Sequence, residues 1–259
     1  MPEGDTVYHA ADQLDRALTG HVLIASDFRI PSLATSDISG STVTGTISRG
    51  KHLLTRFDNG LTLRTHLKME GTWHVHPVGS RWRRPGHSAR VVLRTATTEA
   101  VGFQVMLDLV RTTSEEHLVG HLGPDLLGPD WDADFALSRL MTDPTAPIGV
   151  ALLEQRNLAG VGNVYKSELC FLGQVDPLTP VGDVPDLPAM LARARQLLEA
   201  NKLRHTRITT GDSRRGYQLW VYGRRGPCLR CGAAIRKADQ GPPGHQRPTY
   251  WCPSCQPLL

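Results

Sequence analysis

The sequence lacks the features of a membrane or secreted protein. No apolar run approaches the length that spans a bilayer, and no basic and then apolar leader opens the chain. Internal repeats and long low-complexity segments are also absent. Aromatic residues make up only 6% of the chain, whereas the hydrophobic share of 40% and the charged share of 21% are ordinary for a globular protein. The sequence therefore predicts a cytoplasmic protein, and its 259 residues suit one large or two ordinary domains.

Cysteine is scarce, and its placement is informative. Cys170 stands alone, and we interpret it as a buried apolar residue. The other four cysteines form two pairs, "CLRC" and "CPSC", with twenty residues between the pairs. In a cytosolic chain, where disulfides are disfavoured, this spacing indicates a zinc site. Four thiolates saturate a zinc ion, so we expect one structural ion bound by Cys228, Cys231, Cys252 and Cys255.

Acidic residues are scarce toward the end of the chain. Residues 193–259 carry thirteen Lys/Arg and three Asp/Glu, a balance of +10, whereas residues 1–192 carry a balance of −6. A basic segment of this kind is typical of proteins that bind polyanions. Charge alone therefore favours a nucleic-acid partner over an ordinary solvated surface.

The apolar pattern changes along the chain. Residues 7–18 follow helical spacing, with Gly20 as the stop. Residues 21–113 contain several short strands, including a hairpin turned by Asn59-Gly60, which predicts an antiparallel sandwich or barrel. Gly, Pro and Asp crowd residues 123–131, where we place a linker. Helical segments follow, and they are "DADFALSRLM", "PIGVALLEQRN", "NVYKSELCFLG" and "LPAMLARARQLLEANK".

Two residues directly behind Met1 could carry covalent chemistry. Methionine is commonly removed ahead of a small residue, which would leave Pro2 with a free secondary amine. Such an amine is less basic than lysine and, beside a helix N-terminus, can attack a carbonyl-like carbon to form an iminium. Glu3 could then protonate a departing oxygen or take a proton from the intermediate. Taken alone, a proline here is more often a plain lead-in to a helix.

Three further positions have both a functional and an ordinary interpretation. Lys51 follows a glycine at the start of a strand, where it is either a phosphate contact or surface. Met69 lies near a strand end and is either a wedge between bases or a core-edge residue. Asn163 follows Gly160 and Gly162 and opens a helix, where its side chain and nearby amides could hold a phosphate or merely cap the helix.

Together these stretches resemble one family, the bacterial formamidopyrimidine-DNA glycosylases and endonucleases VIII. The resemblance runs through "MPEGD", "RGKHLL", "HLKMEGTW", "HLGPDLL", "LLEQRNLAGVGNVYKSELCF", "WVYGRRGPCLRCG" and "RPTYWCPSCQ", in that order. It implies an α+β protein of two domains. Residues 1–122 would be a catalytic β-sandwich with an active-site helix, 123–131 a linker, 132–222 a helix–two-turn–helix DNA-binding domain and 223–259 a four-cysteine zinc finger.

The resemblance also implies a role for each candidate residue. Pro2 is similar to the family's nucleophile, Glu3 to its acid, and Lys51 to its phosphate-binding lysine. In the DNA interface, Asn163 and Arg247 match phosphate contacts, and Met69, with Lys68 and Glu70 beside it, matches the residues that fill the gap left by a flipped-out nucleotide. The family excises oxidised bases and cleaves the strand by β,δ-elimination, without an organic cofactor. The resemblance implies a monomer that acts at the bacterial nucleoid on double-stranded DNA. Single-stranded DNA stays open as a second substrate.

The opening "PEG" is typical of the endonuclease VIII branch, and the departures at Asp5-Thr6 resemble its actinobacterial type. The segment "GFQVMLDLVRT" lacks the "RRFG"-like element of the other branch, and the stretch from "TTGDSRRGYQ" to "LWVYGR" is short for a purine-recognition loop. These features favour oxidised pyrimidines. The alternatives are an oxidised-purine glycosylase and a zinc-finger DNA-binding protein without turnover.

Overall fold

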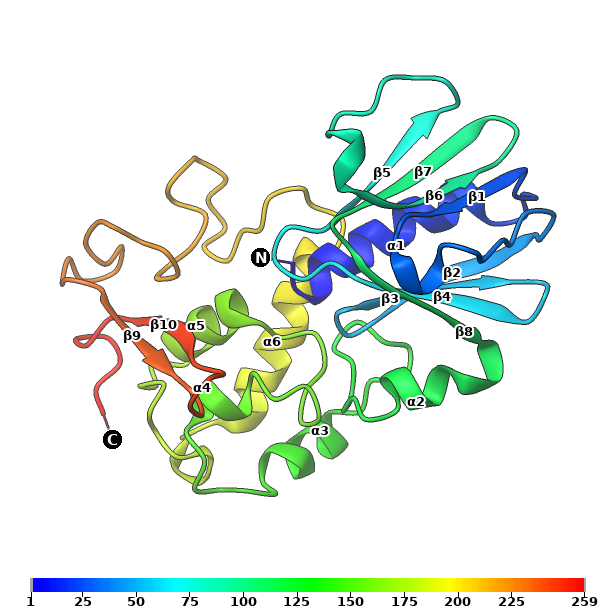
Figure 1. The fold of residues 1–259 in the computed structure, drawn as a ribbon. Coiled ribbons are helices and arrows are strands. Elements are labelled where there is room, and N and C mark those ends of the chain that lie inside the picture. The colour runs from blue at the N-terminus through cyan, green and yellow to red at the C-terminus, as the bar shows by residue number, and fades with distance from the viewer. Residues whose placement is uncertain (1, 259) are drawn as a thin grey trace. The chain divides into compact units, whose positions relative to one another are not determined.

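The computed structural model describes residues 2–258, and Figure 1 shows its elements. The chain forms two units, the first ending at His121 and the second beginning at Leu122. Leu126, inside the stretch predicted as a linker, is fully buried in the core of the second unit. The finer division into residues 1–122, 123–131, 132–222 and 223–259 stays a prediction.

The first unit contains, within the described residues, two four-stranded antiparallel sheets (Figure 1). Apolar residues at alternate positions, such as Leu61 and Leu63 in one sheet and Val91 and Leu93 in the other, direct one face of each sheet toward a shared core. The first sheet has the order β1 (Ala25–Phe28), β6 (Ala89–Arg94), β7 (Thr98–Phe103) and β5 (Thr72–Pro77). The second has the order β2 (Val43–Arg49), β3 (His52–Phe57), β4 (Leu61–His66) and β8 (Met106–Arg111). The unit closes with the short helix α2 (Glu115–Val119). The predicted sandwich is confirmed.

Helix α1 (Gly4–Leu18) packs into the core of this sandwich. Val7, Leu14 and Leu18 recur at helical spacing and are buried together with residues of both sheets. At the far end of the helix, the Asp15 carboxylate accepts a 2.8 Å hydrogen bond from the Thr46 amide, next to the irregularity in β2. Helix α1 is therefore fixed along its length, which holds its N-terminus in one place.

The second unit combines helices with a C-terminal hairpin. In its helical core α3 (Ala133–Leu140) packs against α6 (Leu187–Asn201), and α6 packs against α5 (Asn163–Leu172), which is buried almost throughout. The elements are α3 (Ala133–Leu140), α4 (Ile148–Ala151), α5 (Asn163–Leu172), α6 (Leu187–Asn201), β9 (Arg236–Gln240) and β10 (Arg247–Trp251). Short 3₁₀ turns are η1 (Pro31–Leu33), η2 (Gly86–Ser88) and η3 (Thr112–Ser114) in the first unit and η4 (Val181–Asp183) in the second.

The helix expected over "PIGVALLEQRN" is shorter than predicted and ends at Ala151. The Gln155 side chain explains the early end, because it holds the following residues in tight turns. Its amide nitrogen donates to the carbonyls of Leu153 and Val161, at 2.8 and 2.9 Å, and its amide oxygen accepts from the Gly160 amide at 3.1 Å. These bonds replace the helical ladder. No helix described between residues 2 and 258 combines the length and apolar character needed to cross a bilayer.

Candidate active site and nucleic-acid interface

Pro2 and Glu3 lie at the N-terminus of α1. Pro2 is half-buried and precedes the helix, and Glu3 is the N-cap residue, in an extended conformation with φ −126° and ψ −173°. Glu3 is fully buried, yet its side chain does not cap the helix. The Glu3 carbonyl accepts the first hydrogen bond of the helix, from the Val7 amide at 3.0 Å. A carboxyl group is thus held in a buried position beside Pro2, where the helix dipole favours negative charge.

Basic side chains gather at one end of the second sheet. The register of β3 and β4 places His52 opposite His66, with ring centroids 5.0 Å apart. Lys51 precedes β3, in the turn that Gly50 makes with φ 57°. Burial, together with neighbouring cations that include Arg64, lowers the pKa of His52 to about 3 and that of His66 to about 4. Both imidazoles are therefore neutral at pH 7, in a positive environment suited to an anion.

Acidification is expected to destabilise the first unit through these histidines. A histidine with a folded pKa of about 3 and an unfolded pKa of 6.5 contributes stability above pH 6.5 that is lost as the pH falls toward 3. Between pH 6.5 and pH 5 one such histidine lowers the free energy of unfolding by about 2 kcal/mol. Urea unfolding at pH 7 and pH 5 measures how much free energy of unfolding is lost on acidification. His52→Asn should reduce this loss by about 2 kcal/mol relative to wild type, whereas His21→Asn, at an exposed site, should leave it unchanged. An equal loss in His52→Asn and wild type would contradict the assignment.

A tight turn after β4 presents Met69. Lys68 has φ 50°, and its amide donates to Nδ1 of His66 at 2.9 Å, which requires that nitrogen to be unprotonated. The Gly71 amide closes the turn by donating to the Leu67 carbonyl at 2.7 Å. Met69 at the tip is 64% exposed, so it is not the core-edge residue of the alternative interpretation. The structure thus brings Lys51 and Lys68 together around His66, with Met69 beside them.

Asn163 begins α5 in the second unit and is only 1% exposed. Neither its amide nitrogen nor its amide oxygen finds a hydrogen-bond partner within residues 2–258. A buried, unsatisfied amide is costly, which favours a partner outside the chain. Gly160, just before the helix, has φ 103°, whereas Gly162 is extended. Only the first of the two glycines therefore needs the left-handed conformation.

Arg247 opens β10, which packs against the same helix. The ammonium group of Lys166, one turn after Asn163, donates to Oγ1 of Thr249 at 2.6 Å, deep in the unit. The amide of Tyr250 donates to Oγ of the neighbouring Ser167 at 3.3 Å. Asn163 and the exposed Arg247 are thereby carried by one packed pair of elements, α5 and β10.

The four paired cysteines meet in one cluster. The Sγ atoms of Cys228, Cys231, Cys252 and Cys255 all lie within 4.8 Å of one another. Two of these separations are 3.5 and 3.9 Å. These values are too long for disulfides, and they bracket the roughly 3.8 Å expected between thiolates at the corners of a tetrahedron around zinc. The cluster could therefore hold a metal ion. It packs on Phe171 at the end of α5.

Comparison with known proteins places these features in a family. Residues 1–106 match the model of the formamidopyrimidine-DNA glycosylase N-terminal domain. The probable endonuclease 8 2 of Streptomyces coelicolor is 57% identical, over 99% of this chain and 94% of that protein. The DNA-(apurinic or apyrimidinic site) lyase Nei2 of Mycolicibacterium smegmatis is 47% identical, over 99% of each chain. The chain belongs to the endonuclease 8 family.

A solved structure of the wider endonuclease 8 and formamidopyrimidine-DNA glycosylase group shares the fold. The Lactococcus lactis formamidopyrimidine-DNA glycosylase, solved bound to DNA containing an abasic site, superposes with a TM-score of 0.80. It is 24% identical, and the match covers 98% of this chain and 99% of that one. At this identity the likeness concerns the fold alone, and it agrees with the two antiparallel sheets, the helices and the cysteine cluster of this endonuclease 8 relative.

Sequence reasoning missed some supporting residues of this endonuclease 8 site. His52 and His66 could have been paired by counting outward from the Asn59-Gly60 turn, because the hairpin register places them opposite each other. Glu168, which is fully buried, carries no such signal. Its carboxylate accepts a hydrogen bond from the Thr209 hydroxyl. It also accepts from the three successive amides of Trp220, Val221 and Tyr222, at 2.8 to 2.9 Å. It thereby fixes both ends of the intervening loop.

Proposed function

We propose that this bifunctional DNA glycosylase and AP lyase of DNA repair acts through Pro2 and excises oxidised pyrimidines at the bacterial nucleoid. The observation that carries the proposal is the pairing of Pro2 with a fully buried Glu3 at the start of α1. The family membership supports the same chemistry, since one relative is named an apurinic or apyrimidinic site lyase and others are named endonucleases 8.

The proposed reaction begins once Met1 has been removed. The Pro2 nitrogen attacks C1′ of a flipped-out nucleotide, and the damaged base leaves with the electrons of the glycosidic bond and with the proton that the Pro2 nitrogen gives up. Glu3 protonates the ring oxygen as the sugar opens, which leaves an iminium between Pro2 and C1′. The positive nitrogen acidifies C2′, loss of that proton expels the 3′ phosphate, and a second elimination expels the 5′ phosphate. These steps require no organic cofactor.

The remaining site residues would hold the DNA. Lys51 lies at the basic end of the second sheet, where a phosphate beside the lesion would find compensating charge. Asn163 offers a buried amide without a partner among residues 2–258, and Arg247 offers an exposed guanidinium. Met69, with Lys68 next to it, would enter the duplex where the nucleotide has left the stack.

Two short connections support a pyrimidine preference. β7 and β8 are joined by Gln104-Val105 alone, with Gln104 at φ 52°, which leaves no room for an arginine-bearing insertion. The loop after Thr209 is also short. Its two ends meet at a 2.8 Å hydrogen bond, in which the Thr209 amide donates to the Gln218 carbonyl. Neither connection offers the extended loop that a larger purine lesion would need for recognition.

Matched duplexes that carry one lesion each test the proposed substrate class. Thymine glycol and 5-hydroxyuracil should be excised at least about tenfold faster than 8-oxoguanine, the difference that about 1.4 kcal/mol of transition-state binding supplies. An abasic duplex serves as the positive control for strand cleavage, and an undamaged duplex as the negative control. Faster excision of 8-oxoguanine would instead support the oxidised-purine alternative, and no excision of any lesion would support the non-catalytic one.

We also propose that the cysteine cluster holds one structural zinc ion. The sulfur separations fit tetrahedral coordination, and four thiolates leave no open position for substrate. Bound zinc would fold residues 228–255 as a finger and fix β10, which begins at Arg247. The guanidinium of Arg230 stacks on Phe171, 4.3 Å from its centroid, and anchors the finger to α5.

Loss of one cysteine ligand is expected to remove the metal and weaken DNA binding. Cys252→Ser should lower the zinc content from one ion per chain to a small fraction and reduce duplex affinity at least tenfold, because the finger cannot fold without its metal. The first unit should keep its own unfolding transition. Elemental analysis and fluorescence anisotropy measure the two effects. Cys170→Ser, which changes a buried cysteine outside the cluster, should retain the zinc, and a zinc-free wild-type protein would contradict the assignment.

A further inference from the structure

The connection between β5 and β6 carries a group of arginines that the proposed mechanism does not use. We call residues Ser80–Gly86, with the sequence "SRWRRPG", the arginine loop. No acidic residue occurs between residues 71 and 98. Arg81 and Arg83 are exposed, and within the described part of the chain neither makes a hydrogen bond or an ion pair. Their charge is therefore uncompensated by protein.

Trp82 anchors this loop to the first sheet between the two exposed arginines. Its Nε1 donates to the Glu99 carboxylate at 2.5 Å, and its ring meets Phe103 edge-on, with centroids 5.8 Å apart. Glu99 is only 3% exposed and also binds Arg94, so it is directed inward and does not neutralise the loop surface. Because Trp82 fixes the backbone of the loop, the guanidinium groups on either side of it can bind an anion at little cost in backbone conformational entropy.

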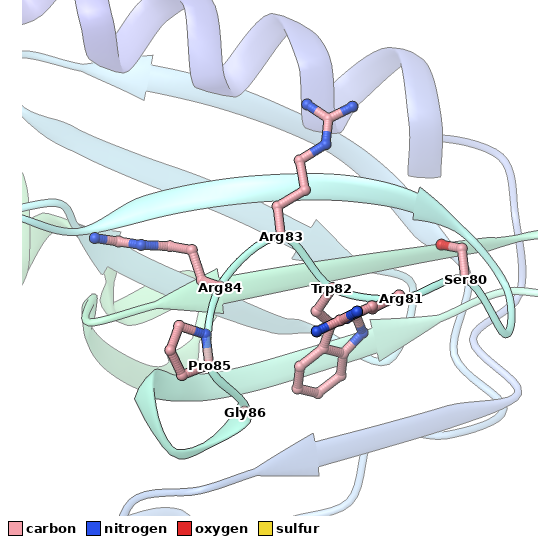
Figure 2. Close-up of a pocket in the computed structure, with 7 residues that line it drawn as sticks. All are labelled: Ser80, Arg81, Trp82, Arg83, Arg84, Pro85 and Gly86. Atoms are coloured by element: carbon pink, nitrogen blue, oxygen red, sulfur yellow. The ribbon is translucent and has the colours of Figure 1, made fainter.

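Arg84 connects the loop to the turn that presents Met69. Its guanidinium donates to the Glu70 carbonyl at 2.9 Å, and Gln104 binds the Glu70 carboxylate at 3.3 Å. The arginine loop therefore lies beside the turn that we expect to enter the duplex. Figure 2 shows the side chains of Arg81, Arg83 and Arg84 extending from the loop in different directions. The residues of the arginine loop line a depression of about 680 Å³.

We propose that the arginine loop is a further phosphate-binding element, which grips the DNA backbone next to the Met69 turn. The inference rests on the proposed function, because that function places the duplex at Met69. Arginine matches the geometry of a phosphate with paired N–H donors, and duplex DNA presents one negative charge about every 1.7 Å along its axis. The grip would hold the backbone while a nucleotide is extruded. It specifies no base, so it applies to damaged and undamaged duplex alike.

The salt dependence of DNA affinity tests this element. Arg81→Gln/Arg83→Gln is compared with Arg16→Gln/Arg111→Gln, which removes the same charge from two exposed arginines outside the loop. The probe is a duplex containing a tetrahydrofuran abasic analogue, and thermal unfolding verifies that both variants are folded. The loop variant should lose about 5- to 20-fold in affinity near 0.1 M salt, and its slope of log affinity against log salt should fall by about 1 to 2. The control should stay within about twofold of wild type. Equal losses in both variants, or none in the loop variant, would overturn the proposal.

A second measurement separates this proposal from the proposed function. At saturating abasic DNA the loop variant should form the same yield of borohydride-trapped adduct as wild type, because only binding has been weakened. If wild type gives no adduct at Pro2, the proposed function fails whatever the salt slopes are. If wild type gives the adduct and the slopes do not differ, the phosphate grip fails while the catalytic assignment stands. A loop variant with a lower adduct yield at saturation would also contradict a role limited to binding.

Discussion

Replacing Glu3 with glutamine is expected to lower the rate of base excision by about 10²- to 10⁴-fold, the range over which a general acid contributes. The amide keeps the size of the side chain but cannot protonate the sugar oxygen. Duplex affinity should remain within about threefold of wild type, because Glu3 is buried at the start of α1 and offers no charge that attracts phosphate. Single-turnover excision of thymine glycol and anisotropy with the same duplex measure the two quantities.

Asp12→Asn is the matched control for Glu3→Gln, since it neutralises a carboxylate farther along the same helix. Asp12 pairs with Arg16 at 2.9 Å near the surface and should be dispensable for excision. If Glu3→Gln excised thymine glycol at the wild-type rate, Glu3 would not be the acid. If both variants lost activity equally, the loss would reflect helix stability, and thermal unfolding would reveal it.

Blocking the Pro2 nitrogen is expected to abolish base excision and strand cleavage together. An extra residue ahead of Pro2 turns its amine into an amide, whose nitrogen has no basic lone pair to attack C1′. The loss should exceed about 10³-fold, because both activities pass through one covalent intermediate. The strongest control is the same protein with a removable N-terminal tag, assayed before and after proteolytic release of Pro2. Strand cleavage by the tagged form at the rate of the released form would show that another group is the nucleophile.

Local patterns in the sequence predicted the elements that depend on neighbouring residues. Asn59-Gly60 fixed the β3–β4 hairpin, and the helical spacing of Val7, Leu14 and Leu18 predicted α1. The spacing of the paired cysteines likewise predicted a cluster, because each pair sits in a tight turn that aims two thiols at one point. In each case the information lies within a few residues along the chain.

Features set by distant contacts were harder to predict. Strand β5 was not identified in advance, although its pairing with β7 completes the first sheet. The Gln155 side chain shortened a helix that periodicity extended past Ala151. Arg84 is separated from Glu70 by thirteen residues, so nothing in the loop itself indicated that it supports the Met69 turn. Contacts of this kind depend on the completed fold rather than on local propensity.

Mapping the covalent bond between enzyme and DNA tests the central claim most directly. Protein with a verified Pro2 terminus is mixed with thymine glycol duplex and borohydride, digested, and sequenced by tandem mass spectrometry. The account predicts a reduced sugar attached to the Pro2 nitrogen in wild type and none in the tagged form. An adduct located on a lysine such as Lys51, or strand cleavage with no trapped species, would contradict it.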